Sequence, residues 1–254
     1  MKSLFEDPIT LEGNVYIASD FHLGAPNKVE SDQREKRIIG WLDTIKEDAN
    51  HLILLGDIFD FWFEYRDVVP RGYFRLLAKL AELHDRGIQL YYFTGNHDMW
   101  VTDYFVSELG VQLFRQQQAF LINGKRHIIG HGDGLGPADH GYKFIKWLFA
   151  QPVNRKLYSA LPPRWAFAIA RYFSRKSRAM TSAAEQQFMG NGNEMLVQYI
   201  QDVLTREEID YFIYGHRHLP IELKIGNSTY INTGDWIMHD SYAKISAEEV
   251  HLYK

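Results

Sequence analysis

Seven Asp, His and Asn residues lie in small polar clusters spread along the chain. They are Asp20, His22, Asp57, Asn96, His131, His216 and His218. Hydrolysis of a phosphate ester requires activated water and neutralised charge on the phosphate oxygens, which two metal ions about 3.5–4 Å apart provide together. Imidazole, carboxamide and carboxylate ligands suit manganese, iron or zinc and leave coordination positions open. These residue types therefore predict a two-metal phosphoesterase centre.

Each cluster directly follows a short apolar run that predicts a β-strand. The runs lie at 15–19, 52–55, 90–93, 127–129 and 211–214. Glycine precedes four of the five clusters, so the backbone can turn sharply where the strand ends. Ligand sites in open α/β sheets lie beyond the carboxyl ends of the strands. With helical stretches near 32–48 and 71–86, the pattern predicts a layered α/β fold that gathers the clusters at one edge.

The middle of the chain changes to a helical pattern. Helical periodicity runs over 142–149, 164–173 and 183–204, and Pro152, Pro162 and Pro163 interrupt it. Short β-prone segments return at 229–232, 242–245 and 250–253. We therefore expect a core made of residues 1–133 and 211–254, with residues 134–210 inserted as a helical cap.

Composition limits the classes of protein that this chain can be. It has no cysteine, which excludes disulfides, thiolate zinc sites and cysteine nucleophiles and suits a reducing compartment. Hydrophobic residues make up 46% and charged residues 24%, an ordinary globular balance. No stretch reaches the roughly 18 uninterrupted apolar residues of a membrane-spanning helix, and the first ten residues show no signal-peptide pattern. We expect a cytoplasmic protein.

The clusters, read in order, resemble the motifs of the calcineurin-like metallophosphoesterase family. The five blocks are Asp-x-His, Gly-Asp-x-x-Asp, Gly-Asn-His-Asp, Gly-His-Gly-Asp and Gly-His-x-His, and they span residues 20–218. The resemblance implies a four-layer α/β/β/α sandwich with two divalent metal ions. It implies that one metal is bound by Asp20, His22, Asp57 and His218. It implies that the other is bound by Asp57, Asn96, His131 and His216, so that Asp57 is the bridge.

The same resemblance gives His97 a catalytic role rather than a metal-binding one. In the family this histidine points at the scissile phosphate, where it stabilises charge or protonates the leaving oxygen. We expect the carboxylate of Asp60 to fix its tautomer, in preference to Asp98. Asp133 is expected to brace the His131 loop, and the turn at 232–235 to pack beneath the site.

The predicted cap combines positive charge with aromatic residues. Between His140 and Arg178 there are nine Lys or Arg residues, nine aromatic residues and no Asp or Glu, in a chain whose net charge is −4. Such a segment can lie on an anionic membrane surface. It can equally cover a pocket for an apolar phosphorylated ligand, or be a helical bundle whose aromatic residues form its own core and whose charges face solvent.

Over most of its length the insertion resembles the cap of the UDP-2,3-diacylglucosamine pyrophosphohydrolases, a family of the lipid A pathway. The similar segments begin at His131, Lys156 and Arg175. The resemblance implies cleavage of the substrate pyrophosphate to UMP and 2,3-diacylglucosamine 1-phosphate, with manganese, at the cytoplasmic face of the inner membrane. It implies that the substrate is contacted by Asp139, Tyr142, Ser177, Arg175 and Arg178.

Three other functions are weighed against this one. The first is a metallophosphodiesterase or nucleotide pyrophosphatase with a soluble substrate, whose cap only grips phosphates. A nuclease is disfavoured because the rest of the chain is acidic and would repel a polyanion, so we expect no nucleic-acid partner. A non-catalytic scaffold of the same fold should have lost metal ligands, whereas all seven are present.

Overall fold

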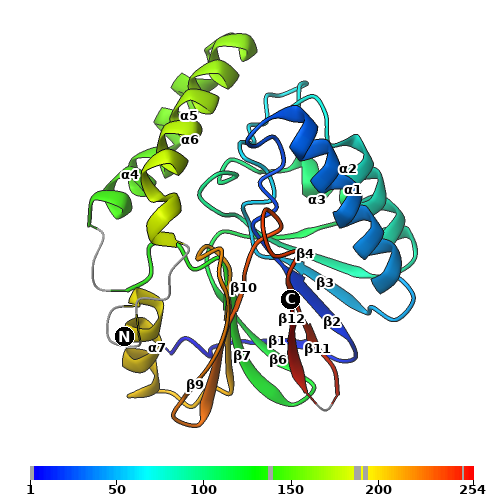
Figure 1. Cartoon of the computed structure of the whole chain (residues 1–254), viewed down its shortest axis with the longest axis vertical. Coiled ribbons are helices and arrows are strands. Elements are labelled where there is room, and N and C mark those ends of the chain that lie inside the picture. The colour runs from blue at the N-terminus through cyan, green and yellow to red at the C-terminus, as the bar shows by residue number, and fades with distance from the viewer. Residues whose placement is uncertain (1–2, 137–139, 186–189, 191–193, 248) are drawn as a thin grey trace.

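The computed structural model describes residues 3–136, 140–185, 190, 194–247 and 249–254. Side chains at 140–142, 145 and 175–185 lie outside this description, although their backbone is placed in helices. Two six-stranded sheets lie face to face, and helices cover their outer faces (Figure 1). This is the four-layer α/β/β/α arrangement that the motif resemblance implied.

The first sheet carries the N-terminal ligand clusters. Its order is β12 (Val250–Tyr253), β11 (Tyr242–Ile245), β2 (Val15–Ala18), β3 (His51–Leu54), β4 (Gln89–Phe93) and β5 (Gln112–Phe114). Strands β2 to β5 run parallel, and their register pairs Ala18 with Leu54 and Leu54 with Tyr92. The loops that follow these three strands therefore begin at the same level of the sheet.

The second sheet carries the remaining clusters. Its order is β1 (Ile9–Leu11), β6 (Gln118–Ile122), β7 (Lys125–Gly130), β8 (Tyr211–Tyr214), β10 (Ser228–Thr233) and β9 (Pro220–Ile225). Strands β7 and β8 are parallel neighbours, and Gly130 pairs with Tyr214. This register brings the His131 loop beside the loop that holds His216 and His218.

Three hydrophobic clusters fill the three interfaces between the layers. The inner faces of both sheets meet in one cluster, with Ile17 and Ile53 from the first and Ile129 and Ile213 from the second. A second cluster joins the first sheet to α1 (Lys28–Ile45), α2 (Phe74–Asp85) and α3 (Tyr104–Leu109). A third joins the second sheet to α7 (Met195–Leu204). Both sheets are thus covered on both faces, which fixes the strand ends that carry the ligands.

The predicted helix over 183–204 is wrong, because two helices lie there. Helix α6 (Pro163–Glu185) ends well before α7 begins at Met195. Between them Gly190 has φ +84°, a left-handed backbone conformation that cannot continue an α-helix. Leu196, Val197 and Ile200 of α7 are buried against the second sheet, so α7 packs with the core layers.

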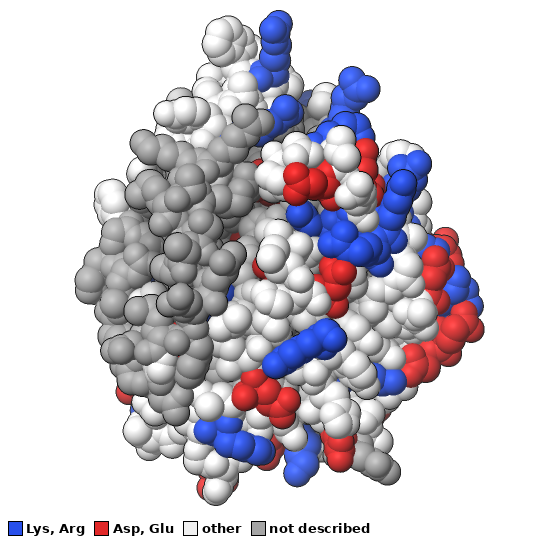
Figure 2. Space-filling view, viewed as in Figure 1, with Lys and Arg blue, Asp and Glu red and all other residues white. Residues whose placement is uncertain are grey.

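Helices α4 (His140–Ala150), α5 (Pro152–Ser159) and α6 form a separate group that rises beyond the ends of the sheets (Figure 1). Tyr158 of α5 packs against Phe61, Phe63 and Trp100 of the core loops. Figure 2 shows Lys and Arg side chains gathered at the upper end of the visible face, whereas acidic and basic side chains are mixed along its right edge.

Candidate metal centre

All seven predicted ligands lie in loops that leave the strands at one edge of the sandwich. Five of them have a left-handed backbone: Asp20 (φ 54°), His22 (42°), Asp57 (52°), His216 (68°) and His218 (53°). This conformation is uncommon outside glycine and costs of order 1–3 kcal/mol per residue, so it persists only where the surroundings impose it. Its concentration in these loops marks the edge as a functional site.

Two glycines allow the ligand loops to approach one another. A Cβ atom on Gly95 would lie 2.6 Å from the backbone nitrogen of Asp57, and one on Gly215 would lie 2.7 Å from Oδ2 of Asp20. Contacts this short do not occur between real atoms, so a side chain at either position would push the loops apart. The glycines that precede Asn96 and His216 in sequence are therefore required by packing.

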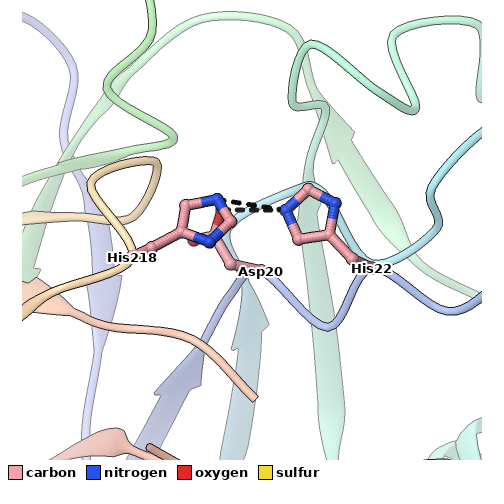
Figure 3. A group of neighbouring side chains, drawn as sticks. All are labelled: Asp20, His22 and His218. Carbon is pink, nitrogen blue, oxygen red and sulfur yellow. Dashed lines mark hydrogen bonds and ion pairs between the residues drawn. The ribbon is translucent and has the colours of Figure 1, made fainter. Parts of the chain in front are cut away.

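One group of ligands consists of Asp20, His22 and His218, whose side chains converge from two sheets (Figure 3). Nε2 of His218 lies 3.2 Å from Nε2 of His22 and 3.4 Å from Oδ1 of Asp20. Oδ1 of Asp20 is buried and has no hydrogen-bond partner among the described residues. A buried carboxylate oxygen facing two imidazole nitrogens without a donor fits a metal ligand set.

The second group consists of Asp57, His131 and His216, with Asn96 beside it. Nε2 of His131 lies 3.5 Å from Oδ2 of Asp57 and 3.3 Å from Oδ1 of Asn96. The same Oδ2 of Asp57 lies 3.7 Å from Nε2 of His22 in the first group. The carboxylate of Asp57 therefore lies within 4 Å of a histidine from each group.

Burial and mutual charge set the protonation of the ligands. Burial alone would raise the pKa of Asp20, but the neighbouring His218 and His22 lower it to about 2. Burial lowers the pKa of both His22 and His216 to about 4, so both are neutral at pH 7. Burial also disfavours charge on His131, but Asp57 and Asp133 outweigh it and raise its pKa to about 10. A metal at this group would displace the His131 proton, because metal ligands must be deprotonated.

Hydrogen bonds behind the ligands hold them in place. Nδ1 of His131 lies 2.6 Å from the carbonyl oxygen of Leu55, and Nδ1 of His218 lies 3.2 Å from the carboxylate of Asp235. Thr233 contacts Ser19 at 2.7 Å, and Ser19 donates to Asp20. The turn at 232–235 thus lies beneath the ligands.

Asp98 holds the neighbouring loops in place and makes no hydrogen bond to the His97 side chain among the described residues. Its carboxylate accepts hydrogen bonds from the backbone N–H groups of Ile58 (2.9 Å) and Gly95 (2.7 Å), and from the hydroxyl of Tyr92. Burial, together with the negative charge of Asp57, raises the pKa of Asp98 to about 6. Asp98 therefore ties the Asp57 loop to the Asn96 loop.

His97 lies beside the first ligand group, with its ring 4.8 Å from that of His22. Its backbone N–H donates to Oδ1 of Asp57 at 2.8 Å. Nδ1 lies 3.0 Å from the backbone carbonyl of Asp60 and 3.8 Å from the Asp60 carboxylate. The carbonyl can only accept a hydrogen bond, so Nδ1 carries the proton, and this contact is shorter than the one to the carboxylate that was expected to fix the tautomer. The Asp60 carboxylate instead accepts from Ser174 of α6 at 2.8 Å.

Some supporting residues carried no signal in the sequence. The buried guanidinium of Arg34 donates to the carbonyl oxygens of Phe21 (3.0 Å) and His22 (2.9 Å), which fixes the first ligand loop. Arg217, between two ligands, makes a two-pronged ion pair with buried Glu194 at the start of α7. The motifs specify neither residue type, because Arg34 lies outside them and Arg217 occupies the variable position of Gly-His-x-His.

The predicted substrate contacts cannot be located. Asp139 lies outside the described residues, as do the side chains of Tyr142, Arg175, Ser177 and Arg178. Asp133, expected behind His131, pairs with Lys146 of α4 at 2.6 Å. It therefore also ties the cap to the ligand loop.

The sequence profile of the calcineurin-like phosphoesterases matches residues 13–220, most of the chain. The chain belongs to this family and is a metal-dependent phosphoesterase with a dinuclear divalent metal site. It is similar to UDP-2,3-diacylglucosamine hydrolase of Porphyromonas gingivalis, with 36% identity over 92% of this chain and 94% of that protein. Proteins of the same name from Serratia proteamaculans (29% identity, 94% of this chain and 98% of that one) and Yersinia pestis (28%, 84% and 90%) are also similar. Within the described ranges, no helix combines the length and apolar character needed to cross a bilayer.

Proposed function

We propose that this chain hydrolyses the pyrophosphate of UDP-2,3-diacylglucosamine to UMP and 2,3-diacylglucosamine 1-phosphate. The observation that carries the proposal is the convergence of the ligand loops in a chain that is 36% identical, over nearly its whole length, to a hydrolase of that name. The metal ions are proposed to be manganese, with iron or zinc as alternatives, because the donor set combines imidazole with oxygen ligands.

The proposed ligand assignment places the phosphate between two groups of residues. Asp20, His22 and His218 would hold one ion, Asn96, His131 and His216 the other, and Asp57 both. Two bound ions supply an activated water and neutralise charge on the phosphate oxygens. The donor atoms fit this role because Asp20 is ionised and His22 and His216 are neutral at pH 7.

His97 is proposed as the group that acts on the scissile phosphate from this chain. Its Nδ1 is engaged by the Asp60 carbonyl, so Nε2 is the atom that can donate to a phosphate oxygen or to the leaving group. The Asp57 contact to the His97 backbone keeps the ring beside the ligands. The carboxylate of Asp60 accepts a hydrogen bond from Ser174 of α6. This bond would hold Asp60, and with it the carbonyl that positions His97.

The cap is proposed to receive the acylated part of the substrate. Large apolar side chains on α4, α5 and α6 expose between 39% and 66% of their surface: Phe144, Leu148, Phe149, Val153, Leu157, Trp165, Ile169, Tyr172 and Phe173. An apolar surface of this extent is unusual for a protein that stays in water and marks a binding site for lipid or membrane. The interspersed cations suit the anionic cytoplasmic face of the inner membrane, where the protein would bind peripherally.

Residues 134–210 are proposed as the insertion that supplies this surface, on a core of residues 1–133 and 211–254. Within the insertion, α4 to α6 would contact the substrate, and α7 would anchor them to the second sheet. Asp139, Tyr142, Arg175, Ser177 and Arg178 are proposed to contact the nucleotide-sugar head.

Comparing rates on matched substrates tests the proposal. The purified enzyme with manganese should hydrolyse UDP-2,3-diacylglucosamine at least a hundredfold faster than the same UDP-sugar without acyl chains. Each buried methylene contributes about 0.8 kcal/mol, so partial burial of two chains is sufficient for this preference. Comparable rates on both substrates, with no binding to anionic vesicles, would instead indicate a phosphodiesterase or nucleotide pyrophosphatase that acts on a soluble substrate.

A further inference from the structure

We propose that a separate cavity beside the metal ligands binds the nucleoside half of the substrate. The inference rests on the proposed function, because it takes the nucleotide to be the leaving half of a cleaved pyrophosphate. The cavity has a volume of about 380 Å³ and lies between α4 and the ends of β4 and β5. Its wall includes His131, so the cavity borders the second ligand group.

The cavity is formed by one face of α4 and the core. Lys143, Lys146, Trp147 and Ala150 line it, and their spacing of three, one and three residues places them on one side of the helix. The opposite wall comes from the segment after β5, with Arg115 and Gln116. Its volume lies within the roughly 300–1,000 Å³ typical of small-molecule pockets.

The charged groups in the wall have fixed partners that hold them in place. Lys146 pairs with Asp133 at 2.6 Å, and Lys143 donates to the carbonyl oxygen of Gly136. The guanidinium of Arg115 donates to the carbonyl oxygens of Met99 and Val101, both at 2.9 Å. Three cations and one carboxylate give the cavity a net positive potential, which favours an anionic ligand.

Two further side chains are available to a ligand. Trp147 is 57% exposed, and its one ring contact among the described residues is with Phe144 on the same helix. Gln116 has no side-chain hydrogen bond to any residue in the described part of the chain. An aromatic face and a carboxamide can stack on and hydrogen-bond to a flat heterocycle.

These features together favour a nucleoside phosphate over an acyl chain. An acyl chain here would bury four charged side chains without replacing their hydration, which is costly. A nucleoside 5′-phosphate places its phosphate at the metal ligands, its sugar near the cations and its base on Trp147. The two halves of the substrate would then leave in different directions, the nucleotide through this cavity and the lipid along the exposed apolar surface of the cap.

Calorimetric titration of the manganese-loaded enzyme with UMP and with ribose 5-phosphate tests the assignment, because the two ligands differ only in the base. We expect UMP to bind about tenfold tighter or more, equivalent to about 1.4 kcal/mol, which is within the range for base stacking on an aromatic ring. Trp147→Ala should bring this ratio close to one, and Gln116→Ala should reduce it several-fold. Trp165→Ala is the matched control, since Trp165 is an exposed cap tryptophan that does not line the cavity, and it should keep the wild-type ratio.

The outcomes separate this inference from the proposed function. Equal affinity for the two ligands, or an equal loss in Trp165→Ala, overturns the nucleoside site even if the acylated substrate is hydrolysed. A ratio that depends on Trp147 and Gln116, in an enzyme that does not hydrolyse the acylated substrate, supports the nucleoside site and overturns the proposed substrate. Circular dichroism establishes that each variant is folded, and Gln116→Ala provides the test if Trp147→Ala does not fold.

Discussion

The ligand edge and the cap differ most in how much of their side-chain surface is exposed. Asp20, His22 and Asp57 are at most 1% exposed, whereas Trp165 on the cap is 66% exposed. At the ligand edge, short polar side chains are fixed by strand ends, buried hydrogen bonds and opposite charges. On the cap, large apolar side chains face outward. The first region has the fixed geometry that metal chemistry needs, and the second has the exposed apolar surface that the proposed function assigns to the acylated substrate.

Metal removal should give the largest loss of activity, and it should act through the ligand edge rather than through the cap. Exhaustive chelation is expected to reduce hydrolysis below detection, because the metal ions supply the activated water. It should also lower the melting temperature, since ions that bind only the folded chain stabilise it. Calorimetry and a rate assay with and without added manganese measure both effects. Full activity after chelation would contradict the two-metal assignment.

His97 tests whether the ligand edge contributes chemistry beyond holding metal. His97→Ala should lower kcat by roughly 10²–10⁴, the range for a lost general acid or charge-stabilising group. Metal analysis should still find two ions, because the proposed ligand set does not include His97. Loss of one ion would make His97 a ligand. High activity in His97→Arg would indicate that the residue acts by charge rather than by proton transfer.

The sequence predicted that the strand-end loops would gather at one edge, because the signals for these loops are local. A glycine and a polar residue directly after an apolar run specify a strand-end loop, and parallel register brings such loops together. The carbonyl of Asp60 could not be predicted as the partner of His97, because every residue has a carbonyl and only the loop geometry selects one. Ser174 reaches Asp60 across 114 positions, and the helical pattern over 183–204 gave no hint of the left-handed Gly190.

His127 tests how burial acts in the core away from the metal ligands. It lies on β7, four residues before His131, and burial outweighs the nearby charge of Asp210 and lowers its pKa to about 4. Above pH 6.5, His127 is neutral in both the folded and the unfolded chain and does not reduce the free energy of unfolding. As the pH falls from 6.5 through 4, the unfolded chain binds a proton that the folded chain does not bind, and the free energy of unfolding falls by about 3 kcal/mol.

Urea denaturation between pH 7 and pH 4 measures this loss. His127→Phe keeps an aromatic ring against Tyr211, which His127 stacks on at 4.9 Å, and removes the titrating group. Between pH 7 and pH 4, the free energy of unfolding should fall by about 3 kcal/mol less in the variant than in the wild type. Because the ligand carboxylates and histidines titrate equally in both proteins, the difference isolates His127. Parallel curves would show that His127 is accessible to protons in the folded state.

Ser174 should give the smallest effect, and it tests whether the two regions are coupled. The buried hydroxyl of Ser174 on α6 donates to the carboxylate of Asp60, whose carbonyl holds His97. Ser174→Ala removes a hydrogen bond to a charged group, worth about 1.5–3 kcal/mol. Only part of this energy positions His97, so kcat should fall by up to about tenfold while the metal content stays at two ions.

A purely structural role for Ser174 would give a different result. It would change the KM for the acylated substrate by shifting the cap and leave kcat for a small aryl phosphodiester unchanged. The positioning role predicts that kcat falls for both substrates, and that Ser174→Ala has little further effect in a His97→Ala background. Ser159→Ala is the matched control, because Ser159 is an exposed cap serine whose hydroxyl bonds only the Lys156 carbonyl within the described residues. Independent, multiplicative effects of Ser174→Ala and His97→Ala would show that the cap and the catalytic histidine act separately.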